Sequence, residues 1–113
     1  MRALRLLPIA LVLVGCETTA TVTGRTDDGE VFTGTAVATG TWEAAGTIHI
    51  VSNRGLTCIG RYRYEGLVGP RGKANYSCSN GDTGEADLVA RTPASGDGQG
   101  TIGSRRITFT FAN

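Results

Sequence analysis

The sequence has few of the residues from which metal sites and acid–base catalysts are built. Its 113 residues include one histidine and three cysteines, so a zinc site lacks ligands and a nucleophile has a single imidazole to activate it. Basic and acidic side chains nearly balance, and the formal net charge of +1 leaves no concentration of positive charge for phosphates. We therefore expect no cofactor, no bound metal ion and no nucleic acid partner.

Good helix formers are scarce beyond the N-terminal segment. Seventeen glycines and sixteen threonines occupy a chain in which only 6% of the residues are aromatic. Glycine weakens helices and threonine favours strands, so many short strands joined by turns are expected. Because the length fits one domain, the sequence predicts a single small antiparallel all-β domain over residues 21–113.

Residues 1–15 have the layout of a secretory signal peptide. Arg2 and Arg5 precede the apolar run Leu6–Val14, and the small residue Gly15 ends the segment. As a helix, these residues would reach roughly 22 Å, against about 30 Å for the hydrocarbon core of a bilayer. The segment is too short to span a membrane, and we predict that it is removed.

A short motif, Leu13-Val14-Gly15-Cys16, lies at the end of this segment. It resembles the lipobox of bacterial lipoprotein precursors. The resemblance implies that cleavage falls before Cys16, that its thiol takes a diacylglyceryl group, and that the new amino group is acylated. Residues 16–20 would then form a lipidated N-terminus and short tether. The alternative is an ordinary secreted protein with a cysteine near its cleavage site by chance.

The residue after the cysteine bears on the destination of such a lipoprotein. Glu17 stands where lipoproteins retained at the inner membrane often carry aspartate. The resemblance therefore implies a lipid anchor in the outer membrane of a Gram-negative envelope, with the folded part facing the periplasm.

Two cysteines remain when Cys16 is assigned to the lipid. Cys58 and Cys78 would lie in a compartment that oxidises thiols, which favours a disulfide between them. A metal site or a catalytic thiol is the alternative, but the chain offers few further ligands and one base.

The residues around these cysteines support the same pairing. Residues 57–64 and 73–79 each show the alternation of a β-strand, and the glycines and proline between them are typical of a turn. An antiparallel hairpin centred near Val68 then places small residues opposite large ones, a known way to stabilise glycine in a sheet. The predicted register opposes Cys58 to Cys78, Gly60 to Tyr76, and Tyr62 to Ala74.

Alternating patterns elsewhere predict a meander of short strands. Asp27-Asp28-Gly29 is typical of a tight hairpin turn, with a calcium site as the alternative use of its acids. Glycine- and proline-rich residues 92–100 predict a loop. The further predicted strands cover residues 21–24, 31–38, 46–51, 85–91 and 105–111.

A nucleotide-binding pattern, G-x-G-x-x-G, begins at Gly98. We interpret it as accidental, because the motif requires a following helix and here a β-patterned C-terminus follows.

Closure best removes exposed strand edges in so small a protein. The sequence therefore predicts a small barrel or a strongly curved sheet of about seven or eight strands. The side chains expected in its core are Val22, Phe32, Ile48, Ile50, Tyr62, Tyr76, Leu88, Ile107, Phe109 and Phe111.

Basic side chains cluster in the middle of the chain and are candidates for contact with an anion or a partner. Arg61 and Arg63, with Arg54, Arg71 and Lys73 nearby in sequence, predict a basic stripe. It would touch acidic lipid head groups or lipopolysaccharide phosphate. The alternative is a solvated sheet face whose charges discourage aggregation at its edge.

The other ionisable groups are weaker candidates for a functional site. His49 alternates with Ile48 and Ile50, so we expect it at the surface. A mechanism built on carboxylates alone stays open. The acids concerned are Glu43, Glu65, Asp82 and Glu85.

The mature part shares further patterns with one group of proteins. G-x-x-C-x-G-x-Y at Gly55–Tyr62, C-x-x-G-x-x-G at Cys78–Gly84, and the Thr-Phe-Thr-Phe ending resemble small, glycine-rich, disulfide-containing lipoproteins of Gram-negative envelopes. This resemblance supplies no catalytic residues. It implies a non-enzymatic envelope lipoprotein with a structural or accessory role.

Two other functions remain possible from the sequence. A binding module, such as an inhibitor of an envelope-attacking hydrolase, would present an exposed aromatic or arginine-rich cluster, most plausibly over residues 65–73. An enzyme would show a concave pocket with converging carboxylates. A structural accessory should show neither.

Overall fold

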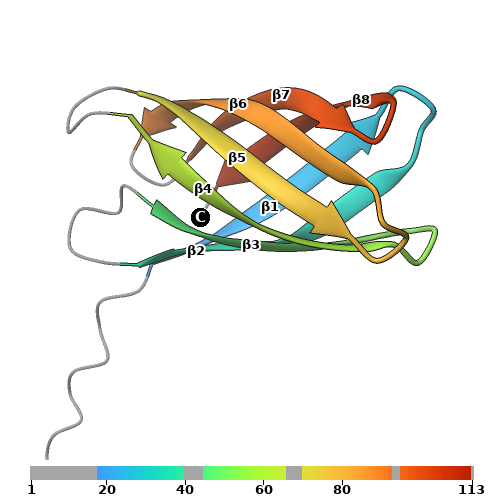
Figure 1. Ribbon diagram of the computed structural model, residues 1–113. Coiled ribbons are helices and arrows are strands. Elements are labelled where there is room, and N and C mark those ends of the chain that lie inside the picture. Colours follow the sequence, from blue (N-terminus) through green and yellow to red (C-terminus); the bar gives the residue numbers. More distant parts are fainter. Residues whose placement is uncertain (1–17, 40–44, 66–69, 93–94, 113) are drawn as a thin grey trace, which may run out of the picture.

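The protein is an eight-stranded antiparallel barrel (Figure 1). The computed structural model describes residues 18–39, 45–65, 70–92 and 95–112. Each strand pairs with the next along the chain, and the first pairs with the last, which closes the barrel. The described residues form no helix long and apolar enough to cross a membrane. The strands are β1 Thr18–Thr26, β2 Val31–Thr39, β3 Ala45–Ser52, β4 Thr57–Tyr64, β5 Arg71–Cys78, β6 Thr83–Thr92, β7 Ser95–Ile102 and β8 Arg105–Ala112.

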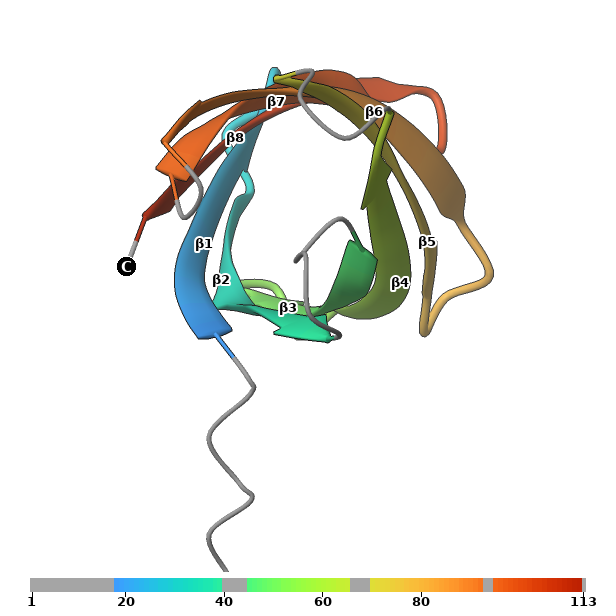
Figure 2. The ribbon, with the colours of Figure 1, turned by 90° about the vertical axis from the view of Figure 1, so that its left-hand side faces the viewer.

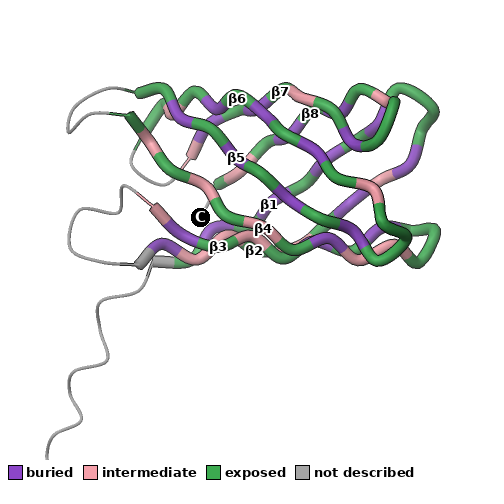
Figure 3. Tube along the Cα trace, in the orientation of Figure 1, coloured by how far each residue is buried: buried purple, intermediate pink, exposed green. Residues whose placement is uncertain are grey.

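The predicted all-β barrel is confirmed, and its side chains alternate between interior and solvent (Figure 3). In β5, Lys73 and Asn75 are exposed, while Ala74 and Tyr76 between them are buried. Since successive side chains of a strand point to opposite faces, each strand sends every second residue into the barrel.

The predicted hairpin of β4 and β5 is confirmed with its register and its disulfide. Cys58 faces Cys78 and the two are bonded. Gly60 faces Tyr76 across the same pair of strands, and Tyr62 faces Ala74.

A glycine faces every aromatic residue that the structure describes. Tyr76, for example, lies between Gly60 and Gly84 on its two neighbouring strands. A methyl group on Gly84 would overlap the Tyr76 ring, because it would lie closer than van der Waals contact allows. The other pairs are Phe32 with Gly24, Tyr62 with Gly46, Tyr64 with Gly72, Phe109 with Gly24 and Gly98, and Phe111 with Gly96.

The prediction of a loop over residues 92–100 is wrong, because most of this segment belongs to β7. Gly96 and Gly98 point inward and are buried, where a side chain at either position would collide with neighbours such as Phe111 and Leu88. Glycine is therefore required at these positions because the barrel interior has no room for a side chain, and not because the chain turns there. The G-x-G-x-x-G pattern runs from this strand through the β7–β8 turn, and a strand follows it.

Strand boundaries otherwise differ from the predicted ones by a few residues. The largest difference is in β1, which begins at Thr18 and ends at Thr26, beyond the predicted 21–24 at both ends. Pairing with β2 starts at Thr18, opposite Ala38, so the last residues of the predicted tether belong to the sheet.

The predicted core residues all point into the barrel. Seven are buried, and Ile48, Tyr62 and Phe111 are partly buried against them. The core also contains Ile102, which lies on the unpredicted strand and is fully buried, and two small residues, Ala74 and Ala86.

The two ends of the barrel differ. At one end, four tight turns join the strands in pairs, and each contains a glycine with positive φ, between 60° at Gly103 and 92° at Gly81. We call this the closed end. At the opposite end β1 begins and β8 ends, and we call it the open end, into which Figure 2 looks.

Removing the disulfide is expected to destabilise the barrel. The bond joins residues 20 positions apart, and closing a loop of this length stabilises a protein by about 3 kcal/mol in the chain-entropy model. We expect the Cys58→Ser/Cys78→Ser variant to lose about that much free energy of unfolding in urea, and Ser77→Ala, an exposed neighbour, to lose little. Equal stability of the double variant and the oxidised protein would contradict the role of the bond.

Candidate functional site

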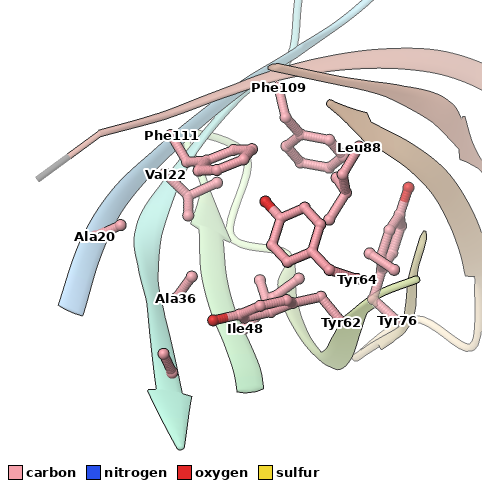
Figure 4. Close-up of a pocket in the computed structure, with 12 residues that line it drawn as sticks. Ala20, Val22, Ala36, Ile48, Tyr62, Tyr64, Tyr76, Leu88, Phe109 and Phe111 are labelled. Carbon is pink, nitrogen blue, oxygen red and sulfur yellow. The ribbon is translucent and has the colours of Figure 1, made fainter. Parts of the chain in front are cut away.

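The open end of the barrel contains an apolar cavity (Figure 4). Its volume is about 50 Å³, several times the minimum that one water molecule needs. None of the described residues that line it is charged. They are Ala20, Val22, Ala36, Ala38, Ile48, Tyr62, Tyr64, Ala74, Tyr76, Leu88, Phe109 and Phe111.

The cavity results from an uneven distribution of side-chain size. Ala20 of β1 faces Ala36 of β2, and Ala38 lies one inward position beyond. Aromatic rings from β4, β5 and β8 line much of the remaining wall, and Tyr76 meets Phe109 edge-on with ring centroids 5.8 Å apart. The small residues of β1 and β2 do not fill the space that these rings leave between them.

The tyrosine hydroxyls differ in their partners. Tyr76 Oη donates a hydrogen bond to the Thr101 carbonyl at 2.6 Å, and burial raises its pKa. The Tyr64 ring meets Tyr62 edge-on, and its hydroxyl points across the cavity (Figure 4). Burial, with a smaller effect of Tyr62, raises the pKa of Tyr64 to about 12. Both groups are therefore uncharged at neutral pH, and the cavity stays apolar.

The cavity does not continue through the barrel, because large side chains fill the closed end. Phe32, Ile50, Ile102 and Ile107 are fully buried there, together with Cys58 of the disulfide. The interior of the barrel is therefore filled by side chains at the closed end and contains the cavity near the open end.

Four charged side chains lie over the packed base, and we call them the ionic cluster: Asp28, Glu30, Arg54 and Arg105. Arg105 bonds Glu30 at 2.5 Å and Asp28 at 3.2 Å, and Arg54 bonds Asp28 at 3.2 Å. The Glu30 side chain is only 4% exposed. The Asp28 oxygens are thus occupied by guanidinium groups and by the Thr26 hydroxyl, an arrangement that does not fit the alternative use of this turn as a calcium site.

The ionic cluster keeps its carboxylates ionised. Burial opposes the charge on Glu30, but hydrogen bonds from Ser52 and Arg105 and the positive charges of Arg105 and Arg54 outweigh it, so the pKa of Glu30 is lowered. The hydrogen bond from Thr26, with smaller effects of Arg54 and Arg105, lowers the pKa of Asp28. Both acids therefore favour the folded state at neutral pH.

The structure brings together only part of the predicted basic stripe. Arg61 and Arg63 point outward from β4, and Arg63 lies opposite Lys73 of β5. Arg71 is exposed at the start of β5. The prediction that Arg54 belongs to this stripe is wrong, because Arg54 lies in a turn at the closed end and pairs with Asp28.

Lys73 differs from the two arginines in having an acidic partner. Its Nζ lies 2.8 Å from Asp87 on β6, and both side chains are mostly exposed. A hydrogen bond and the charge of Asp87 raise the pKa of Lys73. We name Arg61, Arg63, Arg71 and Lys73 the basic face; it lies on the outside of the barrel, toward the open end.

The acids considered for carboxylate catalysis do not converge in the described part of the chain. Glu65 follows β4 at the open end, Asp82 lies in a turn at the closed end, and Glu85 is exposed on the outside of β6. Glu43 lies outside the described residues, as do Cys16 and the leader. His49 is exposed on β3, as predicted.

The cavity itself was not predicted. The sequence does carry a signal for it, since β2 places alanine at two successive inward positions near its end and β1 places another opposite them. That pattern identifies a hollow only when it is known which strands face one another across the barrel.

Comparisons with known proteins identify a fold and no family. No family model and no curated protein matches the sequence. Designed barrels are among the solved structures that it resembles. A redesigned barrel, mFAP1, bound to DFHBI has a TM-score of 0.68 and 16% identity, with 84% of this chain and 92% of that chain covered. A fluorescence-activating barrel designed de novo has a TM-score of 0.65 and 19% identity, with 84% and 90% covered.

Neutralising Glu30 is expected to destabilise the closed end. Glu30→Gln weakens the bonds of a buried side chain to Arg105 and Ser52, and we expect a loss of about 1 to 3 kcal/mol in the free energy of unfolding at pH 7. Asp87→Asn, which removes an exposed pair, should change it little.

The pH dependence of this loss provides a second check. Because the pKa of Glu30 in the folded protein lies below its ordinary value of 4.5, its carboxylate stabilises the fold above that pH, and the contribution disappears as the pH falls through the folded pKa. The difference between wild type and Glu30→Gln in urea unfolding should therefore shrink in acid. A difference that stays constant below pH 4.5 would argue against the role of the charge.

Proposed function

We propose that the protein is a non-enzymatic lipoprotein of the cell envelope, anchored by lipid on Cys16 in the outer membrane, with its barrel on the periplasmic side. One observation carries the orientation: Thr18 begins β1 at the open end of the barrel. The two residue steps from Cys16 to Thr18 reach at most about 7 Å. A lipid on Cys16 would therefore hold the open end, and its apolar cavity, close to the bilayer.

The character of the cavity supports binding over catalysis. Its described lining offers no carboxylate, imidazole, amine or thiol, and its polar side-chain groups are the hydroxyls of three tyrosines, so it lacks most of the groups that act as general acid, base or nucleophile. Three similar designed barrels are bound to DFHBI, and those barrels thus bind a small molecule. For this chain we propose an accessory role at the membrane surface, in which the apolar cavity binds apolar groups.

A second candidate function, a module that contacts a partner protein such as an envelope-attacking hydrolase, is favoured by the outer surface. Ile59 is 60% exposed on β4, two residues before Arg61 on the same outward face. Val51, 41% exposed on β3, lies diagonally across from Ile59. An apolar spot next to exposed arginines is typical of contact surfaces. The same basic face would suit anionic lipid head groups.

The anchor is tested by replacing the cysteine. The full-length protein, produced in a Gram-negative host, should begin at Cys16, carry the added mass of a diacylglyceryl group and an acyl chain, and partition into detergent. Cys16→Ser should abolish the added mass, whereas Glu17→Ser should retain it. Intact-mass spectrometry gives the answer: an unmodified chain, or one cut at another position, would contradict the proposed anchor.

The basic face is tested with protein that starts at Glu17 and therefore has no lipid. Each basic residue near an anionic surface contributes about 1 kcal/mol, so Arg61→Gln/Arg63→Gln should weaken binding to phosphatidylglycerol vesicles about 30-fold. Arg25→Gln/Arg106→Gln, which removes the same charge at the closed end, is the matched control. Equal losses in both variants, or none in the first, would rule out head-group contact at this face.

A further inference from the structure

The apolar cavity and the proposed anchoring residue lie at the same end of the barrel. β1 enters the sheet at Thr18, and its next two inward residues, Ala20 and Val22, line the cavity. Cys16 precedes Thr18 by two residues, so a group attached to it starts within about 7 Å of the barrel opening. The following inference rests on the proposed lipidation.

We propose that one acyl chain of the lipid on Cys16 folds back into the open end of the barrel and occupies the apolar cavity. The remaining chains stay in the bilayer and hold the protein there, since two chains suffice for stable anchoring. The occupant is thus a group of this same molecule.

The size and chemistry of the cavity fit a slender chain. About 50 Å³ accommodates the few carbon atoms at the end of an unbranched chain. Methylene groups need no hydrogen bonds, and the described lining is apolar apart from tyrosine hydroxyls. An empty space beside the Tyr62 and Phe109 rings forfeits contacts that a chain would restore.

Covalent attachment favours this occupant over a free lipid. A tethered group binds at the effective concentration set by its tether, which is high when the tether is short and spans the distance. The opening also faces the bilayer in the proposed orientation, so the chain passes from one apolar environment to another without crossing water. A membrane lipid would have to lift out of its leaflet to reach the same position.

The position of Tyr64 adds a feature that suits such a chain. Its hydroxyl reaches across the cavity toward Val22 and Phe111 (Figure 4), near where a chain entering from the open end would pass. The Tyr64 ring gives such a chain a further apolar surface in the cavity.

The experiment uses full-length protein in its own membrane. Bacteria are supplied with a fatty acid that carries a photoreactive diazirine near its methyl end, the isolated membranes are irradiated, and the purified protein is digested and mapped by mass spectrometry. Intact-mass spectrometry first establishes whether Cys16 is lipidated. If no lipid is found on Cys16, the proposed anchor itself is wrong. With lipid present, we expect the Cys16 lipopeptide to be joined within one molecule to peptides that contain Tyr62, Leu88 or Phe109.

The matched variants are Ala36→Phe and Thr35→Phe. Ala36 lines the cavity, whereas the neighbouring Thr35 side chain is exposed on the outside of β2. Filling the cavity should reduce the internal cross-link about tenfold, equivalent to about 1.4 kcal/mol, and Thr35→Phe should leave it unchanged. Far-ultraviolet circular dichroism and the oxidised Cys58–Cys78 peptide verify that both variants fold.

Three outcomes would overturn the inference while leaving the anchor intact. The cavity peptides could carry a separate phospholipid, which would make a membrane lipid the occupant. The lipopeptide could be joined to outward residues or to a second copy of the chain. Finally, internal cross-links could be equally abundant in Ala36→Phe and Thr35→Phe.

Discussion

The narrow interior of a closed eight-stranded barrel is the constraint on which the rest of this structure depends. Such a barrel is just wide enough for side chains to fill, so each large residue needs a small one beside it. The chain meets this need by setting a glycine opposite every described aromatic residue, as Gly98 faces Phe109 and Gly96 faces Phe111. The abundance of glycine is therefore a packing requirement: rings occupy the volume that side chains on the neighbouring strand leave free.

The same constraint explains why the two ends differ. At the closed end Phe32, Ile50, Ile102 and Ile107 point inward, and all four are fully buried. At the open end β1 and β2 place alanines inward while β4, β5 and β8 place rings there, and the volume that the alanines leave unfilled becomes the cavity. The closed end is then covered by the bonds of Glu30 and Arg105, which place a satisfied charge pair over the apolar base and exclude water from it.

The strands whose local pattern is complete could be predicted from the sequence. The β4–β5 hairpin could be assigned residue by residue, because alternation, turn residues and two cysteines all gave the same register. β7 could not, because glycine occupies three of its four inward positions, Gly96, Gly98 and Gly100, and a run of closely spaced glycines has the local appearance of a loop. The cavity and the ionic cluster depend on contacts between distant segments, such as Glu30 with Arg105, and no local pattern reports them.

An apolar opening exposed to water is unfavourable, and the arrangement of the chain offers a way to avoid that cost. All four tight turns and the ionic cluster lie at the closed end, where they suit an aqueous environment. The start of β1 and the alanine-lined wall lie at the other end, next to the proposed lipid on Cys16. If the anchor holds that end against the bilayer, the hollow faces hydrocarbon and not water. The difference between the two ends of the barrel and the position of the anchor then both keep the apolar opening away from water.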